Sequence, residues 1–143
     1  ELTPDYDAVV SWDVLEHLKD PIAFLTQINS IMKQNGVFCF STLDVDNWFP
    51  KLMGKHWPWL MDMHLFYFNS NTTEQFLNRA GFKIIRAERY VHYISIPYLA
   101  EKINAILPWG LGRPFYLIRK VVPQQLLVPF SLGDIKLYIC LKE

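Results

Sequence analysis

The chain has 143 residues, of which 51% are hydrophobic and 20% charged, which suits one globular domain with a core and excludes a disordered or fibrous protein. Fourteen acidic and 14 basic residues give a formal net charge of zero, so no overall positive field favours nucleic acid. Charged residues interrupt the apolar second half before any run reaches the roughly 18 to 20 residues that a membrane-spanning helix needs.

The first informative segment is residues 6–21. Tyr6 to Val10 is an apolar run that predicts a strand, and it leads into a polar crossing at 11–13 and a short turn that carries Glu16 and His17. Ligands of open α/β sheets bind at the carboxyl ends of strands. The turn after this strand is therefore a candidate functional site.

A helix should follow this turn, because Asp20 is a typical N-cap and Pro21 suits the first helical position. Asn35-Gly36 predicts its end. The next run, Val37 to Leu43, is almost entirely apolar, as expected for a strand that helices cover on both faces. Helical spacing is seen in the apolar positions between the two signals: Ile22, Leu25, Ile28, Ile31 and Met32.

Residues 48–69 are crowded with aromatic side chains and are broken by proline and glycine, which predicts a packed irregular segment such as a lid or a pocket wall. A capping signal, Asn71 with Glu74 or Thr72 with Gln75, then predicts a helix that ends at Gly81. Phe82 to Tyr90 reads as another strand.

Residues 93–132 form an apolar, mildly basic stretch that prolines divide into short pieces, with one amphipathic helical piece between Ile96 and Leu107. We predict an inserted cap at 93–132 and a partial α/β domain made of 1–92 and 133–143. The cleanest strand is Ile135 to Leu141, where apolar and polar residues alternate.

Cys39 and Cys140 lie in apolar runs and are expected to be buried thiols in a reducing compartment, so we expect a cytoplasmic protein without a disulfide framework. The first residue is Glu1 rather than Met, and no signal-peptide pattern follows it. We therefore expect the chain to be part of a longer gene product.

These motifs together resemble class I S-adenosylmethionine-dependent methyltransferases. The resemblance is carried by residues 6–10, 12–18, Asp20-Pro21 and Asn35-Gly36, and it continues through 64–69 and 79–82. It implies the C-terminal half of a Rossmann-like seven-stranded sheet: strands four to six and a last antiparallel strand inserted between five and six. The alternating final strand agrees with that role.

The resemblance also implies a first half with a glycine-rich turn and an acidic residue for the cofactor, and neither occurs in these 143 residues. Gly110-Leu111-Gly112 does not replace that turn, because no strand precedes it and no third glycine follows. We expect an incomplete part of an enzyme, inactive alone. The apolar edge of strand four should then be bare, which favours a homodimer or a swapped dimer.

By resemblance, Ser11, Trp12 and Asp13 should border the methionine and sulfonium part of S-adenosylmethionine. The alternative is that Trp12 is a core residue and Asp13 a helix cap. Asp13, Glu16 and His17 also share one face if the turn is helical, and a similar arrangement binds a divalent ion in methyltransferases of ubiquinone biosynthesis. We predict no metal here, because a hard ion prefers more oxygen ligands, and assign these side chains to structural hydrogen bonds and pocket lining.

His64 is the first candidate for the general base that takes a proton from an acceptor hydroxyl, and His17 is the second. The alternative for His64 is a hydrogen bond to a loop carbonyl. Four aromatic residues are predicted to line the substrate site or to contact the sulfonium cation with their ring faces: Trp57, Trp59, Tyr67 and Phe68. The alternative is that they are ordinary core residues.

The function that we predict is methyl transfer from S-adenosylmethionine to a small-molecule or lipid-linked acceptor, with oxygen as the preferred atom over carbon or nitrogen. The alternative is a non-catalytic methyltransferase-like module that binds a partner or a membrane surface through 93–132. A packed cap or a dimer interface is a third interpretation of that stretch. No nucleic-acid partner is expected.

Overall fold

The computed structural model describes residues 6–106 and 122–143. The described chain divides into two compact units. The first contains the residues up to Tyr90 together with Leu132–Glu143, and the second is Val91–Ser131.

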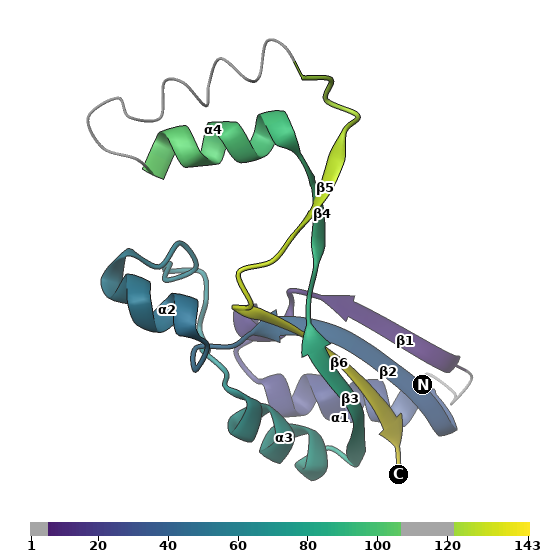
Figure 1. The fold of residues 1–143 in the computed structure, drawn as a ribbon. Helices are drawn as coiled ribbons and strands as arrows, with labels where there is room; N and C mark the ends of the chain where they lie inside the picture. Colours follow the sequence, from purple (N-terminus) through teal and green to yellow (C-terminus); the bar gives the residue numbers. More distant parts are fainter. Residues whose placement is uncertain (1–5, 107–121) are drawn as a thin grey trace. The chain divides into compact units, whose positions relative to one another are not determined.

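The first unit is built on a four-stranded sheet in the order β1-β2-β6-β3 (Figure 1). β1 (Tyr6–Trp12) and β2 (Met32–Leu43) are parallel, whereas β6 (Ile135–Lys142) runs antiparallel to both β2 and β3 (Phe82–Arg89). The last strand of the chain therefore lies between two earlier ones, which confirms its expected position. β1 is an edge strand in this sheet, with β2 as its one neighbour among the described strands.

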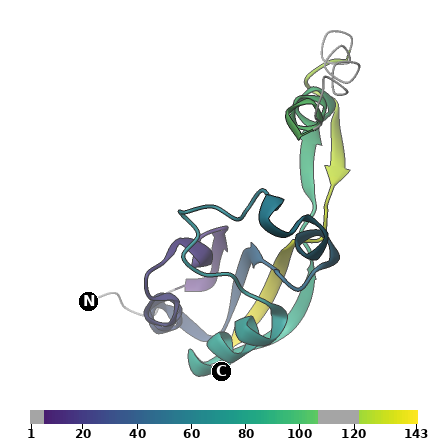
Figure 2. The same ribbon diagram turned by 90° about the vertical axis from the view of Figure 1, so that its left-hand side faces the viewer.

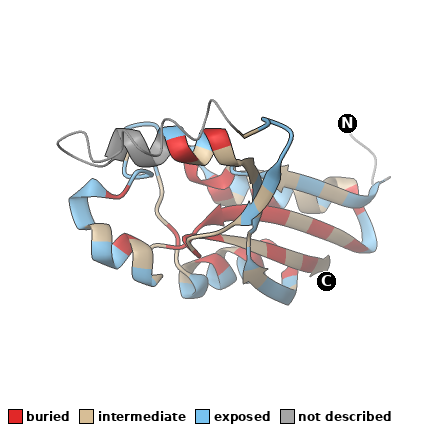
Figure 3. Cartoon of the chain, turned by 45° about the horizontal axis from the view of Figure 1, so that its top comes forward, coloured by how far each residue is buried: buried red, intermediate tan, exposed pale blue. Residues whose placement is uncertain are grey.

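Two helices, α1 (Pro21–Ile31) and α3 (Ser70–Arg79), pack against one face of this sheet (Figures 1 and 2). Leu25 of α1 and Leu77 of α3 are fully buried. On the strands, buried residues alternate with more exposed ones, as Figure 3 shows. The side chains that these two leucines meet in the main core come from β2, β3 and β6: Phe38, Phe40, Phe82, Tyr138 and Cys140.

The opposite face of the sheet is not covered to the same degree within the described residues. Val10 and Ile85 lie next to the core-packed Val9 and Ile84 in their strands, and they are 63% and 56% exposed. The prediction that helices cover both faces of the 37–43 strand is therefore confirmed for one face. Cys39, on the other face of β2, is half-buried rather than buried, while Cys140 is buried, and both are free thiols.

α1 begins as the sequence predicts and ends earlier. Asp20 Oδ1 accepts a hydrogen bond from the Ala23 amide at 2.9 Å, and Pro21 occupies the first helical position. The predicted end at Asn35-Gly36 is wrong, because the helix stops at Ile31 and β2 begins at Met32. Lys142 Nζ, from the end of β6, donates to the backbone oxygens of Asn29 and Met32 and so satisfies carbonyls at this helix end.

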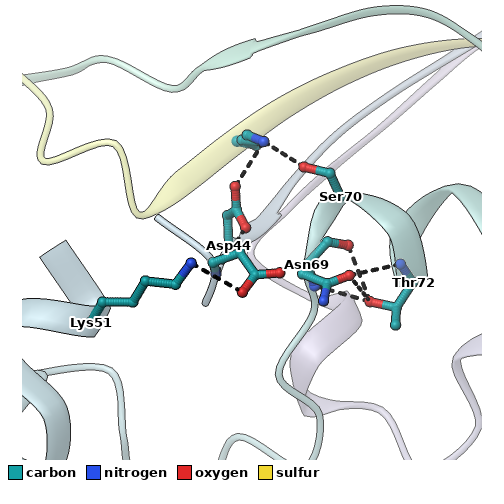
Figure 4. Close-up of polar contacts among 7 residues, drawn as sticks. Asp44, Lys51, Asn69, Ser70 and Thr72 are labelled. Atoms are coloured by element: carbon teal, nitrogen blue, oxygen red, sulfur yellow. Dashed lines mark hydrogen bonds and ion pairs between the residues drawn. The ribbon is translucent and has the colours of Figure 1, made fainter. Parts of the chain in front are cut away.

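α3 is also capped, but its N-cap lies two residues before the nearer of the two predicted caps. Asn69 is the N-cap: its Oδ1 accepts from the Thr72 amide at 2.8 Å, and Thr72 Oγ1 accepts from the Asn69 amide at 2.9 Å (Figure 4). This reciprocal pair is a capping box. The predicted pairs Asn71 with Glu74 and Thr72 with Gln75 do not form it. Beside the cap, Lys136 contacts both Asp44 and Ser70.

Between β2 and α3 the chain forms α2 (Trp48–Met53), the 3₁₀ turn η2 (Gly54–His56) and an irregular segment up to Asn69. Trp57 anchors this segment, since it is buried with Leu43 and Ile135 in a second core cluster. Its indole Nε1 donates to Asp134 Oδ2 at 3.0 Å. The predicted packed irregular segment is thus confirmed for these residues.

In the second unit, β4 (His92–Ser95) pairs with β5 (Leu127–Phe130) in an antiparallel ribbon, and α4 (Ile96–Ile106) follows β4 directly. The amphipathic helix predicted between Ile96 and Leu107 is confirmed over Ile96–Ile106. Residues 107–121 of the predicted cap, with the Gly110-Leu111-Gly112 segment, lie outside the described residues. In the described parts of the chain, no helix is both long and apolar enough to cross a membrane.

Candidate functional site at the carboxyl end of β1

The polar residues 11–13 at the end of β1 are fixed by hydrogen bonds to β2. Asp13 has a φ of 50°, in the left-handed region that non-glycine residues rarely adopt. Its amide donates to Ser41 Oγ at 3.0 Å, and Ser41 Oγ donates to Asp13 Oδ1 at 2.7 Å. Asp13 is therefore neither a helix cap nor a free carboxylate. The two hydrogen bonds fix the turn where the carboxyl ends of the parallel strands β1 and β2 meet.

The turn itself is η1 (Leu15–His17), and it directs Glu16 inward. Glu16 is 1% exposed, and its Oε2 accepts a hydrogen bond from Thr42 Oγ1 at 3.1 Å. Burial raises the pKa of this carboxyl above its ordinary value, against the opposing effect of hydrogen bonds from its own backbone amide and from Thr42. Of the residues that the structure describes, no lysine or arginine forms an ion pair with it.

The aromatic segment meets this turn directly. The backbone amides of Leu65 and Phe66 both donate to the Glu16 carbonyl oxygen, at 2.8 and 3.1 Å. His17 Nδ1 lies 3.0 Å from the Met63 carbonyl oxygen. The turn at 11–17 and the segment around residue 64 therefore lie against each other at the carboxyl end of β1.

His17 and His64 face each other in this contact, with ring centroids 4.6 Å apart and planes tilted by 59°. His64 Nδ1 lies 2.7 Å from the Trp59 carbonyl oxygen, which is the loop-carbonyl bond that the sequence left as an alternative. Because a carbonyl oxygen only accepts, Nδ1 carries the hydrogen in both rings. In the neutral state each imidazole then keeps its lone pair on Nε2, where it can accept a proton or bind a cation.

The four predicted wall residues separate into two groups. Trp57 and Phe68 are buried in the two core clusters, as the core interpretation predicts. Trp59 is 37% exposed, and Tyr67 is half-buried, with its hydroxyl bonded to the backbone of Met61. Only Trp59 and Tyr67 thus have side-chain surface that a ligand could contact.

On the β1 side, Trp12 is 45% exposed and stacks on Tyr90, with ring centroids 5.7 Å apart. The interpretation of Trp12 as a core residue is therefore wrong. Ser11 is half-buried and pairs with Phe40 of β2 in the strand register. Trp12 and the turn after it leave an aromatic face accessible at the strand end.

The sequence reasoning missed two residues that hold side chains of the candidate site in place, namely Ser41 and Thr42. Both are fully buried near the end of β2, and both bond to side chains of the β1 turn. The available signal was the pair of hydroxyl residues that ends an otherwise apolar strand. Polar side chains at such a position require partners, and here they find Asp13 and Glu16.

The mixed sheet, with helices packed on one face, is that of an α/β domain. In open α/β sheets, ligands bind at the carboxyl ends of the strands, where the polar turn lies. Residues 2–87 match the family described as Methyltransferase domain. This match covers more than half of the chain. The chain therefore belongs to the class I S-adenosylmethionine-dependent methyltransferase family. Membership implies S-adenosylmethionine as the methyl donor.

Solved structures share the fold. A methyltransferase from Thermotoga maritima, described as a possible histamine N-methyltransferase, has a TM-score of 0.56 at 13% identity over 99% of this chain and 58% of its own. A putative methyltransferase from Bacillus halodurans has a TM-score of 0.53 at 12% identity, over 99% and 66%. The putative methyltransferase bound to the Trm112 activator in Haloferax volcanii has a TM-score of 0.60 at 15% identity, over 99% and 56%.

The chain thus spans between 56% and 66% of the length of these relatives. At identities this low, the likeness establishes the fold. The curated proteins contain no match to the sequence.

Proposed function

We propose that this protein transfers a methyl group from S-adenosylmethionine to an oxygen atom of a small-molecule or lipid-linked acceptor. The observation that carries the proposal is the contact between Glu16-His17 and the segment 63–66 at the carboxyl end of β1, in a chain of the methyltransferase family. Methyl transfer depends mainly on holding the acceptor in line behind the sulfonium methyl while water is excluded. A turn and a loop tied together at a strand end suit that task.

The sheet is proposed to be the C-terminal half of the seven-stranded methyltransferase sheet, with β1, β2, β3 and β6 as strands four, five, six and seven. The order β1-β2-β6-β3 and the antiparallel β6 support this assignment. The exposed edge and open face of β1 also support it, because further strands and helices would cover them. Alternatively, a second copy of the chain could cover this edge in a homodimer or a swapped dimer.

The cofactor is proposed to lie against Ser11, Trp12 and Asp13. The exposed ring of Trp12 offers an apolar and electron-rich surface to a sulfonium cation. The acceptor is proposed to lie between this surface and the residues Trp59 and Tyr67. His64, with His17 as the second candidate, takes the acceptor proton through Nε2 in the metal-free protein.

Calorimetric titration with S-adenosylmethionine tests the proposal. The gene product extended upstream of residue 1 through a glycine-rich turn is expected to bind the cofactor, and Trp12→Ala should weaken that binding about tenfold. Trp48→Ala is the matched control, because Trp48 is also exposed but lies on α2. Absence of binding heat in the extended protein, or equal effects of the two tryptophan variants, would contradict the proposal.

A second candidate function rests on the second unit. Within Val91–Ser131, the described side chains of Tyr93, Tyr98, Leu126 and Leu127 are exposed, and Tyr93 reaches 69%. Exposed aromatic and leucine side chains suit contact with a membrane surface or a partner. If the protein is a non-catalytic module of a cytoplasmic assembly, it should sediment with anionic vesicles, should lose that binding in Tyr93→Ser, and should not bind S-adenosylmethionine.

A further inference from the structure

Three side chains at the contact between turn and loop have the composition of a metal site. Glu16, His17 and His64 each offer a potential ligand atom, and these atoms lie within 4.8 Å of one another. Asp13, which the sequence grouped with Glu16 and His17, is outside this set, because its carboxylate is bonded to Ser41. The loop histidine takes its place.

Both imidazoles are oriented by the backbone. Nδ1 of His17 donates to the Met63 carbonyl at 3.0 Å, and Nδ1 of His64 donates to the Trp59 carbonyl at 2.7 Å. Metal-binding histidines almost always donate their second ring N–H to a carbonyl or a carboxylate, which fixes the tautomer and the ring orientation. In the neutral imidazoles, the same arrangement leaves Nε2 of each ring without a hydrogen, so that its lone pair can bind a cation.

The Glu16 carboxylate is buried without an ion-pair partner among the described residues, which is a separate indication of a site. Glu16 is 1% exposed, its carboxylate accepts hydrogen bonds from Thr42 Oγ1 and from its own backbone amide, and no lysine or arginine in the described chain forms an ion pair with it. A buried carboxylate is costly unless a charge or several donors compensate it. A bound cation beside Oε1 and the two Nε2 atoms would supply that compensation.

We infer that Glu16, His17 and His64 bind one divalent transition-metal ion of the zinc type and leave a fourth coordination position open. Two imidazoles with one carboxylate suit Zn²⁺ or Co²⁺, whereas Mg²⁺ prefers oxygen ligands alone. Tetrahedral Zn²⁺ with bonds of about 2.0–2.1 Å requires ligand atoms about 3.3 Å apart, so binding should draw the loop and the turn closer. When bound, the ion would supply a Lewis acid to the acceptor hydroxyl, a role that rests on the proposed methyl transfer.

The test uses the purified protein after dialysis against a chelator. Zn²⁺ titrated in competition with a chromogenic chelator should bind at one equivalent and raise the melting temperature, and Co²⁺ should give visible absorption bands of four-coordinate geometry. Mg²⁺ should do neither. His64→Ala and Glu16→Gln should each weaken Zn²⁺ binding at least about tenfold, while circular dichroism of the metal-free proteins confirms that both variants fold.

Two controls make the result specific. His56→Ala removes an exposed histidine of η2 outside the group and should bind Zn²⁺ like the parent protein. Asp13→Asn should also retain binding, because Asp13 is not a proposed ligand. Equal loss in His56→Ala and His64→Ala, or no stoichiometric binding, would overturn the inference. Cofactor binding is measured separately by calorimetry. Absence of S-adenosylmethionine binding would contradict the methyltransferase proposal, whereas absence of Zn²⁺ binding would contradict the metal site.

Discussion

Asp13 and Ser41, which are 28 residues apart in sequence, bond to each other in both directions at the carboxyl ends of β1 and β2. The Asp13 amide donates to Ser41 Oγ at 3.0 Å, and Ser41 Oγ donates to Asp13 Oδ1 at 2.7 Å. This exchange offsets the unfavourable left-handed conformation of Asp13, which has a φ of 50°. The start of the candidate site is therefore set by a strand that follows it in the sequence.

Ser41→Ala should lower the free energy of unfolding by about 1–2 kcal/mol, because it leaves the Asp13 amide and carboxylate without their partner. Urea denaturation measures this change. Ser30→Ala is the control, since Ser30 Oγ bonds to the Gln27 carbonyl on the exposed side of α1 and should change stability by less than about 0.5 kcal/mol. Equal losses in the two variants would contradict the role assigned to Ser41.

Trp57→Phe should destabilise the protein by about 2 kcal/mol. The substitution keeps an aromatic ring in the second core cluster but removes the Nε1 donor from Asp134, a buried carboxyl group. Trp59→Phe, at an exposed position of the same segment, is the matched variant and should be nearly neutral. Thermal or urea unfolding distinguishes them, and a neutral Trp57→Phe would show that the hydrogen bond contributes nothing net.

Alkaline pH should destabilise the fold through Cys140. Burial raises the pKa of this thiol from 9.0 to about 12. The folded state therefore keeps the proton that the unfolded chain loses, so this stabilisation is complete below pH 9 and declines as the pH rises towards 12. The loss should reach about 1.4 kcal/mol at pH 10.

Cys140→Ala provides the comparison for that decline. The variant should be less stable than the parent near pH 7, because it leaves a small cavity in the core. Its free energy of unfolding should fall less steeply between pH 8 and pH 10, so the difference between the two proteins should narrow. Parallel declines in urea denaturation would show that the thiol does not contribute.

In the metal-free protein, His64→Ala should reduce turnover by about a hundredfold while changing S-adenosylmethionine affinity little, if His64 receives the acceptor proton. Release of S-adenosylhomocysteine measures turnover with any hydroxylated acceptor that supports it, and calorimetry measures affinity. His56→Ala should leave both unchanged. An unchanged rate in His64→Ala would end the assignment of this residue to proton transfer.

Local signals predicted the elements that depend on neighbouring residues. The Asp20-Pro21 start of α1 and the alternation of β6 are both present as expected, because capping and strand alternation act over a few residues. The predicted end of α1 was wrong, since the helix stops at Ile31, where Lys142, more than 100 residues away, satisfies backbone carbonyls. No signal near Ile31 could have revealed that contact.

The same distinction applies to the site. Glu16, His17 and His64 were singled out from residue type and position, but their grouping required the loop to fold back onto the turn. Asp13 was placed with them on the assumption of a helical turn, whereas Ser41 draws its carboxylate away. The bonds between the loop and the Glu16 carbonyl decide the first outcome, and the Ser41 hydroxyl on β2 decides the second. Hydroxyl residues at a strand end give only a weak signal of such contacts.

The loop is attached to the turn through main-chain atoms, because one carbonyl oxygen, that of Glu16, accepts both the Leu65 and Phe66 amides. Replacing the side chain at position 16 leaves that acceptor in place. Evolution or an experimenter can thus alter the chemistry of the carboxylate and keep these two hydrogen bonds, whereas a proline at position 65 or 66 would remove one of them and leave the carboxylate in place.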